Sequence, residues 1–547
     1  MIKILTTASL FFALFISCRS NSKSENDISN GSGNEKQKKI TKRDHGITAA
    51  NAFNDVFFDS MTVVKFNAEN SLPDSISRRI TSFYNARNYQ FAWFDKEGLT
   101  EQARGFWNMH NYQTTYGNDT LLKDDALKVQ MDRYAAEDSM NVSSTDSKVI
   151  LTELKLTQHF ITYNLNSIGK GYIKRKEMER FIPIKKMDAL LLADSLVTKK
   201  HKDNKYYEDV NISFKLLKDQ LAKYISLSKQ GGLPVISVAA KKIKKGAADP
   251  GIIPLKKYLW LTADMQPDTT DIFNDVLEGG IKNFQLRFGY KPTGVLTDRL
   301  IADMNVPLLD RIKQILLNMG RMQWLINEPI GQLILVNIPE FILHVKEGKT
   351  KVFDMTVVVG KEGHNTMMFT GDLSQVVFSP YWNVPVSIVT KEILPEMNKR
   401  PDYLASHNME IVGSSGGIPV IRQLPGGDNS LGKIKFLFPN SYNIYFHDTP
   451  AKSLFQRDKR AFSHGCIRLS DPAKMANYLL QDRAEWSPEK IDSAMNGDKE
   501  QYVKLKKPVP VLITYYTAWV DDNGLLHFAD DIYGHDKKAI EKMFVKS

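Results

Sequence analysis

The chain has 547 residues, which is too long for a single hydrophobic core and predicts three or more domains. Hydrophobic residues make up 42% of the sequence and charged residues 25%, as in ordinary globular proteins, and the net charge is +11. A positive net charge of this size is compatible with binding to nucleic acid, to a membrane surface or to an anionic polymer. Nucleic acid is disfavoured, because the sequence has no zinc-ligand pairs, no phosphate-binding glycine loop and no basic segment interleaved with aromatic residues.

The first 18 residues have the pattern of an export signal. Lys3 is followed by an apolar run from Ile4 to Ile16 that is too short to cross a bilayer comfortably. Because the run ends in Ser17-Cys18, the segment resembles a bacterial lipoprotein signal, in which the cysteine is diacylated and becomes the first residue. Two acyl chains on Cys18 would anchor the chain stably in a membrane. The alternative is a plain secretory signal, with Cys18 discarded on cleavage.

The residues after the signal predict a tether. Residues 19–45 are polar and charged and cannot bury a core, so we expect a flexible segment that extends to residue 65. Signal and tether together predict an exported protein of the cell envelope, as an outer-membrane lipoprotein facing the periplasm. Once Cys18 is acylated or removed, Cys466 is the only thiol left. No intramolecular disulfide can then form, and Cys466 is either a buried small hydrophobic side chain or a nucleophile.

Apolar residues recur at helical spacing between about 70 and 235, as at Leu151, Leu154 and Ile161, and predict a mostly helical region. A further helix is expected over 308–325, with one apolar stripe that includes Ile312 and Leu316.

Residues 265–307 predict a compact helical unit. We expect a helix that stops at Gly289, a turn at Pro292-Thr293-Gly294 and a second helix that opens at Thr297. The pattern resembles the small three-helix peptidoglycan-binding module. Thr293 occupies the place of an aspartate common in that module's turn, so a helical spacer that binds no glycan is an equal alternative.

A sheet is expected to begin near residue 333, where runs rich in β-forming residues alternate with glycine and charged turns. Residues 390–440 look irregular and are rich in glycine, proline and asparagine. Because long loops inside compact domains usually carry function, this segment is predicted to be a lid or a binding loop.

The stretch FSHGCIR, residues 462–468, surrounds Cys466 with groups that can activate a thiol. A nucleophilic cysteine needs a base or a cationic neighbourhood, and histidine is the natural base near neutral pH. His464 lies two residues from Cys466, and His447 lies 19 residues upstream at the end of an expected strand. The spacing alone leaves both histidines open as the base.

Gly465 can adopt backbone conformations that other residues resist, so it could aim the amides of Gly465 and Cys466 at one point, as an oxyanion hole requires. Arg468 adds positive charge that could lower the pKa of the thiol or bind a substrate carboxylate. One thiol with nearby imidazoles falls short of the ligands of a structural zinc site. We therefore expect no metal and no cofactor.

The constellation His447 … Ser463-His464-Gly465-Cys466 … Arg468 resembles the signature of the L,D-transpeptidases, thiol enzymes that crosslink bacterial peptidoglycan. The flanking segments are similar to the large, multidomain branch of that family. They are YWNVP at 381–385, RQLPGGDNSLG at 422–432, FLFPN at 436–440 and YFHDTP at 445–450. One departure is Thr366-Met367, which stands where the family often has Thr-Pro. We expect this pair to lie away from the thiol.

The resemblance implies a role for each residue of the constellation. The nucleophile would be Cys466 and the general base and acid His447. Gly465, Tyr445, Ser463 and His464 would hold the oxyanion or shape the site, and Arg468 would contact the substrate. Apart from the resemblance, Trp382 is a candidate to line the substrate groove, with core packing as an equal alternative. The neighbouring Asp448 is expected to be structural, since adjacent residues on a strand point to opposite faces.

The predicted fold is multidomain α+β, with a helical scaffold and a small three-helix module followed by a mostly β L,D-transpeptidase catalytic domain with an inserted capping lid. The expected divisions are a signal peptide (1–18), a tether (19–65), the scaffold (66–237), the peptidoglycan-binding-like module (238–308), a linking helix (309–330) and the catalytic domain (331–547).

The expected function is that of a peptidoglycan L,D-transpeptidase that forms 3→3 crosslinks between stem peptides through a cysteinyl thioester. Its expected partners are the stem peptides and glycan of the wall and a membrane, with no nucleic acid. A thiol L,D-carboxypeptidase or endopeptidase on the same stems is one alternative, and a non-catalytic lipoprotein that tethers the wall is another.

Overall fold

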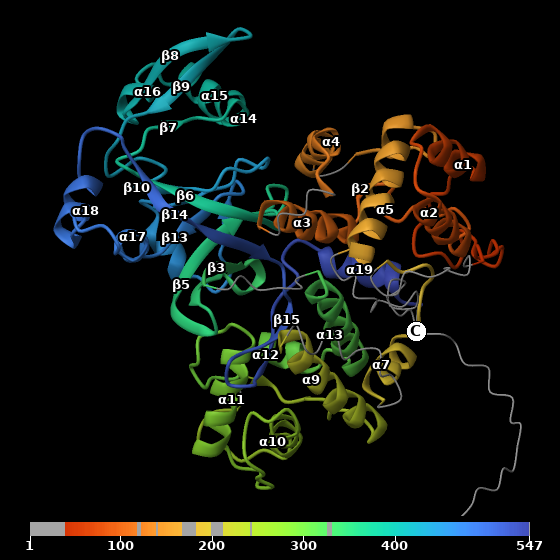
Figure 1. The fold of residues 1–547 in the computed structure, drawn as a ribbon. Coiled ribbons are helices and arrows are strands. Elements are labelled where there is room, and N and C mark those ends of the chain that lie inside the picture. The colour runs from red at the N-terminus through yellow and green to blue at the C-terminus, as the bar shows by residue number, and fades with distance from the viewer. Residues whose placement is uncertain are drawn as a thin grey trace, which may run out of the picture.

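The computed structural model describes residues 39–116, 122–137, 140–166, 182–198, 212–240, 243–324 and 331–545. The expected signal peptide and Cys18 lie outside these residues. None of the helices within the described ranges has the length and apolar character needed to cross a membrane. A helical part, a sheet-based part and a small helical unit lie side by side, which confirms the predicted α+β class (Figure 1).

The N-terminal helices pack around one large hydrophobic core. They are α1 (Ser60–Glu69), α2 (Asp74–Ala86), α3 (Glu101–Tyr116), α4 (Asp125–Ala136), α5 (Ser147–Asn166), α7 (Ala189–Val197) and α9 (Ile212–Lys229), with a hairpin of β1 (Phe94–Asp95) and β2 (Gly98–Leu99) between α2 and α3. Trp93, Phe106 and Phe160 meet at the centre, with ring centroids 5.3–5.4 Å apart. Aromatic burial of this kind fixes how α3 and α5 cross.

The predicted tether is too long. Phe53, Val56 and Phe58 are buried in the scaffold core, and Ile47 is buried just before them. Helix α1 then begins at Ser60, because the Asp59 side chain accepts a hydrogen bond from the N–H of Met61 and caps it. The polar composition of residues 19–45 gave no sign that the next few residues would pack.

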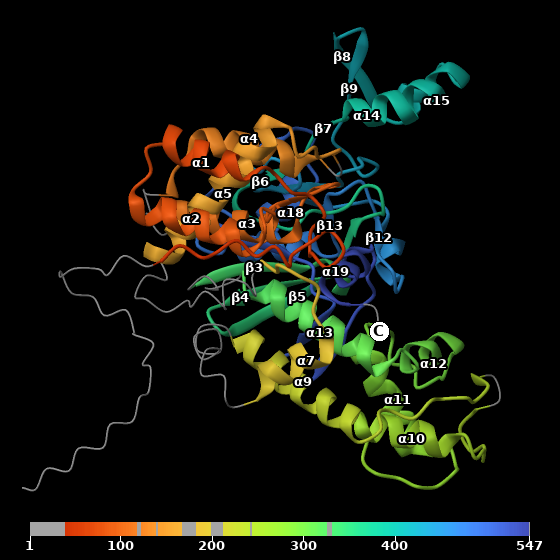
Figure 2. The same ribbon diagram turned by 90° about the vertical axis from the view of Figure 1, so that its right-hand side faces the viewer.

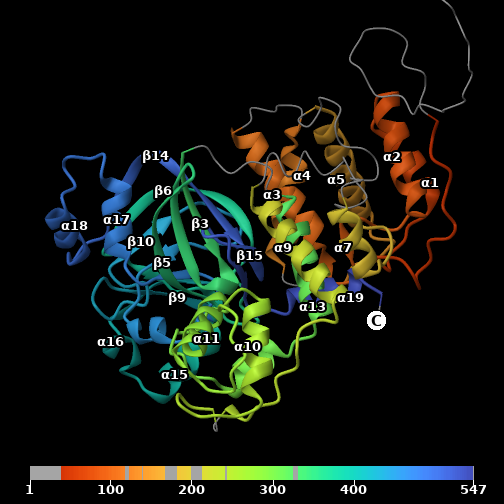
Figure 3. The ribbon, with the colours of Figure 1, turned by 90° about the horizontal axis from the view of Figure 1, so that it is seen from below.

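Helix α13 (Leu308–Met322) is a core helix rather than a linker. Ile312, Ile315, Leu317 and Met319 are all buried, which leaves little of its surface to solvent. The last elements of the chain join it, although they were predicted to belong to the catalytic domain. These are β15 (Ala518–Val520), β16 (Leu526–Phe528) and α19 (His535–Met543). Figure 3 shows α13 and α19 among the scaffold helices α5, α7 and α9.

The small unit has the three helices that were predicted, α10 (Ile252–Leu261), α11 (Asp275–Arg287) and α12 (Asp298–Met304). Thr297 caps α12 by accepting a hydrogen bond from the N–H of Leu300, as expected for a helix that opens there. The core of the unit already includes Ile236. The turn before α12 is held by Gln285, whose side chain accepts from the N–H of Gly294 and donates to Thr293 Oγ1.

The sheet-based part, which was predicted to be catalytic, is built on a large curved sheet. Its strands are β3 (Gln332–Asn337), β4 (Ile342–Glu347), β5 (Thr350–Gly360), β6 (Phe369–Phe378), β10 (Ile434–Leu437), β11 (Phe446–His447), β12 (Ala461–Ser463), β13 (Ile467–Leu469) and β14 (Gln501–Thr514). Among the described residues they follow the order β12-β5-β13-β11-β10-β6-β14-β3-β4, and β4 also pairs with β5. That extra pairing closes the sheet on itself, in the manner of a barrel.

Short helices complete the catalytic part. They are η4 (Ile338–Glu340), η6 (Lys452–Gln456), α17 (Pro472–Leu480) and α18 (Pro488–Met495). Met475 and Leu480 of α17 and Ile491 of α18 are buried in the same core as the sheet. Helices α17 and α18 therefore pack against the sheet.

The predicted irregular lid is an ordered subdomain. It consists of the strands β7 (Trp382–Asn383), β8 (Met409–Ser415) and β9 (Ile418–Gln423), paired in the order β7-β9-β8, and the short helical turns α14 (Val386–Ile388), η5 (Val389–Ile393), α15 (Leu394–Lys399) and α16 (Tyr403–Ser406). Val384, Val389, Ile393 and Ile421 form its own small core. The subdomain starts before residue 390, ends before β10 and projects away from the sheet (Figure 2).

Candidate active site

Two short parallel strands bring the candidate residues together. Phe446 on β11 pairs with Ile467 on β13, and both side chains are fully buried in the core. Side chains alternate along a strand, so the residues on either side of this pair point to the opposite face. Those residues are Tyr445, His447, Cys466 and Arg468. The register of one strand pair therefore gathers a thiol, an imidazole, a phenol and a guanidinium on one face.

His447 is buried and held in one orientation. Its Nδ1 lies 2.5 Å from the backbone carbonyl of Asp448, so we assign the proton to Nδ1, and Nε2 is left with its lone pair. Burial and the nearby charge of Arg468 lower the pKa of His447 to about 3. A neutral imidazole with an unprotonated Nε2 can accept a proton at physiological pH.

Cys466 rests as a neutral thiol. Its Sγ lies 3.6 Å from the backbone carbonyl of Asn443, to which the thiol donates. Burial raises the pKa of Cys466 to about 11, although hydrogen bonds from Tyr445 and the charge of Arg468 oppose the shift. The thiol and the imidazole of His447 are thus both neutral at physiological pH.

The turn before the thiol is held from within by Ser463. Its Oγ donates to the carbonyl of Cys466 at 2.5 Å and accepts from the N–H of Gly465 at 3.2 Å. Gly465 has φ +109°, a conformation that side-chain-bearing residues rarely adopt. The Gly465 amide, predicted to hold an oxyanion, is therefore already paired. The Cys466 amide has no hydrogen-bond partner among the described residues and remains available, as a single donor beside the Tyr445 hydroxyl.

Thr366 lies at this turn and not away from it, contrary to the prediction. Its Oγ1 donates to the carbonyl of Gly465 at 2.7 Å and accepts from the N–H of Gly360 at 2.9 Å. Tyr533 completes the arrangement, since its hydroxyl donates to the Gly360 carbonyl and accepts from the N–H of Thr366. Sequence reasoning missed both residues. The departure at Thr366-Met367 was the one signal that pointed here.

Arg468 is a half-buried cation without a carboxylate partner. No described acidic side chain lies within ion-pair distance of its guanidinium, and its Nε is buried without a hydrogen bond. Burial lowers the pKa of Arg468, and the neighbouring thiol of Cys466 opposes that shift. A desolvated guanidinium on the thiol's face is suited to an anionic group of a ligand, which it can bind through two hydrogen bonds.

His464 and Trp382 lie toward the lid. His464 Nε2 is 3.2 Å from Glu392 Oε1 on η5, and its ring contacts that of His364 at a centroid distance of 4.7 Å. Trp382 sits on β7 of the lid sheet, opposite Gln423. Of the two candidate bases, only His447 shares the strand-pair face of the thiol.

Asp448 has a structural role, as predicted. Its carboxylate accepts from the N–H of Lys433 at 2.9 Å and pairs with Lys452 Nζ at 2.5 Å. Within the described ranges, no cluster of three or more His, Cys, Asp or Glu side chains is arranged to hold a metal ion.

Comparisons with known proteins match two parts of this chain. Residues 331–511 match the family model of the L,D-transpeptidase catalytic domain, and residues 78–221 match that of a scaffold domain. A protein of Haemophilus influenzae named as an L,D-transpeptidase is 31% identical over 220 residues, which are 38% of this chain and 45% of that protein. The chain thus spans less than half the length of this curated relative.

Two solved structures also match. The L,D-transpeptidase from Mycobacterium smegmatis is 14% identical and matches over 34% of this chain and 60% of that chain, with a TM-score of 0.20. The L,D-transpeptidase from Stackebrandtia nassauensis is 15% identical and matches over 51% of this chain and 96% of that chain, with a TM-score of 0.22. Scores this low add nothing to the description of the fold given by the strand pairing.

The neutral resting thiol predicts the pH dependence of its reactivity. Because only the thiolate reacts, alkylation of Cys466 by iodoacetamide should be slow at pH 7 and should rise about tenfold per pH unit toward a midpoint near 11. Mass spectrometry of the Cys466 peptide after timed alkylation measures this rate. A reactive plateau between pH 4 and 7 would instead reveal a preformed thiolate–imidazolium pair.

The hydrogen bonds of Thr366 predict that it positions the nucleophile. Thr366→Val leaves the Gly465 carbonyl and the Gly360 N–H unpaired, and the rate of acylation of Cys466 should fall about tenfold or more. Intact-mass time courses with a donor substrate measure the rate, and Thr350→Val, an exposed position on β5, is the matched control. A lower melting temperature with an unchanged acylation rate would show that Thr366 acts on stability alone.

Proposed function

We propose that this chain, which matches the L,D-transpeptidase catalytic domain at residues 331–511 and a scaffold domain at residues 78–221, crosslinks peptidoglycan stem peptides through a thioester on Cys466. The observation that carries the proposal is the shared face of β11 and β13. On it lie the thiol, a neutral imidazole and a guanidinium that has no acidic partner among the described residues.

Acylation begins when the donor stem places its amide carbonyl beside the thiol. His447 Nε2 takes the proton from sulfur as sulfur attacks the carbonyl carbon, so that charge develops on the substrate oxygen and not on a resting thiolate. The Cys466 amide and the Tyr445 hydroxyl are the available donors for that oxygen. The carbon–nitrogen bond then breaks, the imidazolium of His447 returns its proton to the leaving amine, and terminal D-alanine departs.

Deacylation reverses these roles. The amine of a neighbouring stem, the D-centre amine of diaminopimelate for a 3→3 crosslink, attacks the thioester carbon. His447 takes a proton from that amine and returns it to sulfur as the carbon–sulfur bond breaks. The cycle restores the neutral thiol and leaves a new amide between two stems.

Arg468 is proposed to bind a carboxylate of the donor stem. Its guanidinium is half-buried, without an acidic partner among the described residues, and on the face of Cys466. A carboxylate bound there would hold the scissile amide beside the sulfur. The reacting groups would then be oriented before the reaction, so that little entropy is lost in reaching the transition state.

The lid is proposed to exclude water during the thioester stage. Glu392 of η5 reaches His464, two residues from the thiol, at 3.2 Å. A thioester exposed to water would hydrolyse, and the enzyme would then act as a carboxypeptidase. The balance between crosslinking and hydrolysis thus depends on how completely the lid covers Cys466.

Crosslinking can be tested by intact-mass measurement on the full chain in detergent. With a purified disaccharide-tetrapeptide, the wild type should give a dimer that lacks one D-alanine and an acylated chain as intermediate. Cys466→Ala should abolish both products, and Ser144→Ala, an exposed position on the scaffold, should retain them. Tripeptide monomers without dimers would assign a carboxypeptidase. No turnover by the wild type would contradict the proposal and favour a tethering role.

We also propose that the chain is exported and anchored through Cys18. The support is the signal pattern of residues 1–18, with its apolar run ending at a small residue and cysteine. An outer-membrane anchor facing the periplasm would hold the catalytic domain near the wall. In cells fed an alkyne-labelled fatty acid, the wild-type chain should carry the label and Cys18→Ser should lose it. An unlabelled wild-type chain would mean that the signal is a plain secretory one.

A further inference from the structure

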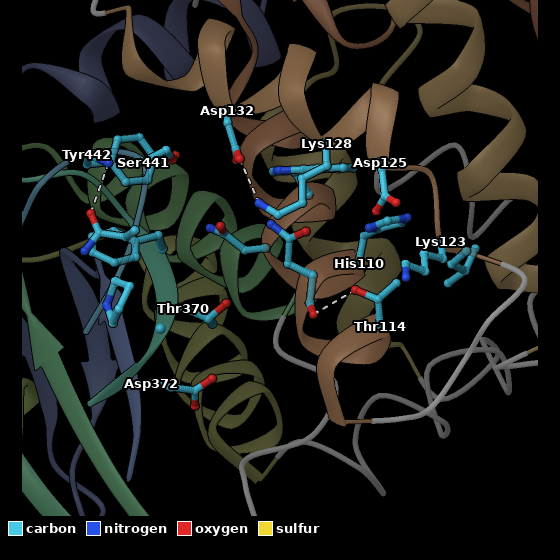
Figure 4. A pocket seen from close by; sticks show the side chains of 18 of the residues that line it. His110, Thr114, Lys123, Asp125, Lys128, Asp132, Thr370, Asp372, Ser441 and Tyr442 are labelled. Atoms are coloured by element: carbon cyan, nitrogen blue, oxygen red, sulfur yellow. Dashed lines mark hydrogen bonds and ion pairs between the residues drawn. The ribbon is translucent and has the colours of Figure 1, made fainter. Parts of the chain in front are cut away.

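A cavity of about 540 Å³ lies between the scaffold and the catalytic domain. Helix α3 and the start of α4 form one wall, and the start of β6 together with residues 439–442 forms the other (Figure 4). Its volume falls in the range of roughly 300–1,000 Å³ that small-molecule sites occupy. Figure 4 shows Thr370 and Asp372 on the sheet side, across the cavity from His110 and Thr114 on the helical side.

Neutral polar side chains contribute a large share of the lining, beside apolar surface. Amides and hydroxyls are contributed by Asn108, Asn111, Thr114, Thr370, Ser374 and Ser441. Three of the charged side chains are in ion pairs. Lys128 pairs with Asp132 at 2.7 Å, and Asp124 pairs at 2.7 Å with Lys155, which lies outside the lining. The wall holds more carboxylates than lysines, which disfavours an anionic ligand. The lining is suited to an uncharged ligand rich in hydroxyl and amide groups.

Three residues of the wall each hold a buried polar atom without a hydrogen bond in the described part of the chain. They are Trp107 with Nε1, His110 with Nδ1 and Asp372 with Oδ1. Trp107 and His110 are each only 3% exposed, and their rings stack at a centroid distance of 4.6 Å. Unpaired buried polar atoms are rare because they are costly. The wall of the cavity therefore holds hydrogen-bonding groups that the described residues do not satisfy.

The cavity and the thiol lie at two ends of one loop. Asn440 holds this loop, because its Oδ1 accepts from the N–H groups of Tyr442 at 3.0 Å and Ile444 at 3.2 Å. Tyr442 lines the cavity, and the carbonyl of the next residue, Asn443, accepts the hydrogen bond from the Cys466 thiol. The lining of the cavity and the contact with the thiol thus come from adjacent residues of one loop.

We propose that this cavity binds a saccharide segment of the polymer whose stem peptide reaches Cys466. The identity of the polymer rests on the proposed function, whereas the preference for an uncharged, hydroxyl- and amide-bearing chain rests on the lining itself. N-acetylated amino sugars have this chemistry. The scaffold domain then contributes to substrate binding and not only to support.

Binding of a stem-free sugar tests the inference apart from catalysis. The probe is a tetrasaccharide of β-1,4-linked N-acetylglucosamine, titrated into the full chain in detergent by calorimetry. Asp372→Asn removes the charge of the buried acceptor, and Ser441→Trp fills the cavity from an exposed position. Each should weaken binding at least about tenfold. Asp522→Asn, an exposed residue outside the cavity, is the matched control and should bind as the wild type does.

Melting temperatures show whether each variant is folded. If Asp372→Asn does not fold, the test of the cavity rests on Ser441→Trp. Binding weakened by either folded cavity variant and retained by the control supports the inference. If the wild type does not bind the tetrasaccharide, the inference is wrong. If all variants bind it equally well, the inference is also wrong, because the sugar must then bind another surface, such as the 238–308 module. Thioester formation with a sugar-free tetrapeptide reports separately on the proposed function, so failure of one can be told from failure of the other.

Discussion

The parallel pairing of β11 with β13 is the constraint on which the site depends. Each strand contributes only two or three residues, yet their register decides which side chains share a face. A shift of one residue on either strand would send its polar side chains into the core and its apolar ones to the surface. The fully buried Phe446 and Ile467 make such a shift costly, so the hydrophobic core of the sheet holds the thiol and the imidazole together.

The turn that presents the thiol is supported from distant parts of the chain. Thr366 binds its Gly465 carbonyl, and Tyr533 binds Thr366 and Gly360 in turn. The N–H of Tyr533 donates to the hydroxyl of Tyr515, over whose ring the guanidinium of Arg321 lies. Because Arg321 also pairs with acidic residues of α3 and α19, a buried polar network links the scaffold to the turn that carries Cys466.

This connection gives a physical reason for the return of the chain to the scaffold after the last strand of the sheet. The segment that carries Tyr515 and Tyr533 must lie beside both the nucleophile turn and α13, and β15, β16 and α19 bury their apolar residues in the scaffold core. The scaffold and the catalytic domain are therefore not independent units joined by a linker. Their contact also forms the cavity below residues 439–442, so that one interface supports the turn and encloses a pocket.

The sequence by itself determined those features that depend on local spacing. The solitary Cys466 with His447 and Arg468, the opening of α12 at Thr297 and the start of the sheet near residue 333 can all be read from neighbouring residues, because helix caps, strand patterns and short motifs are local. The α+β class followed from the same local patterns.

Only the tertiary structure decided which histidine shares the face of the thiol, since that choice depends on strand register. It also revealed that Ser463 accepts a hydrogen bond from the Gly465 amide and that Thr366 holds the turn. Burial keeps the Cys466 thiol neutral. Phe53, α13 and the end of the chain pack into the scaffold core. These features arise from contacts between residues far apart in the chain. Burial and hydrogen-bond pairing at that range are set by the fold as a whole, and no local pattern of residues records them.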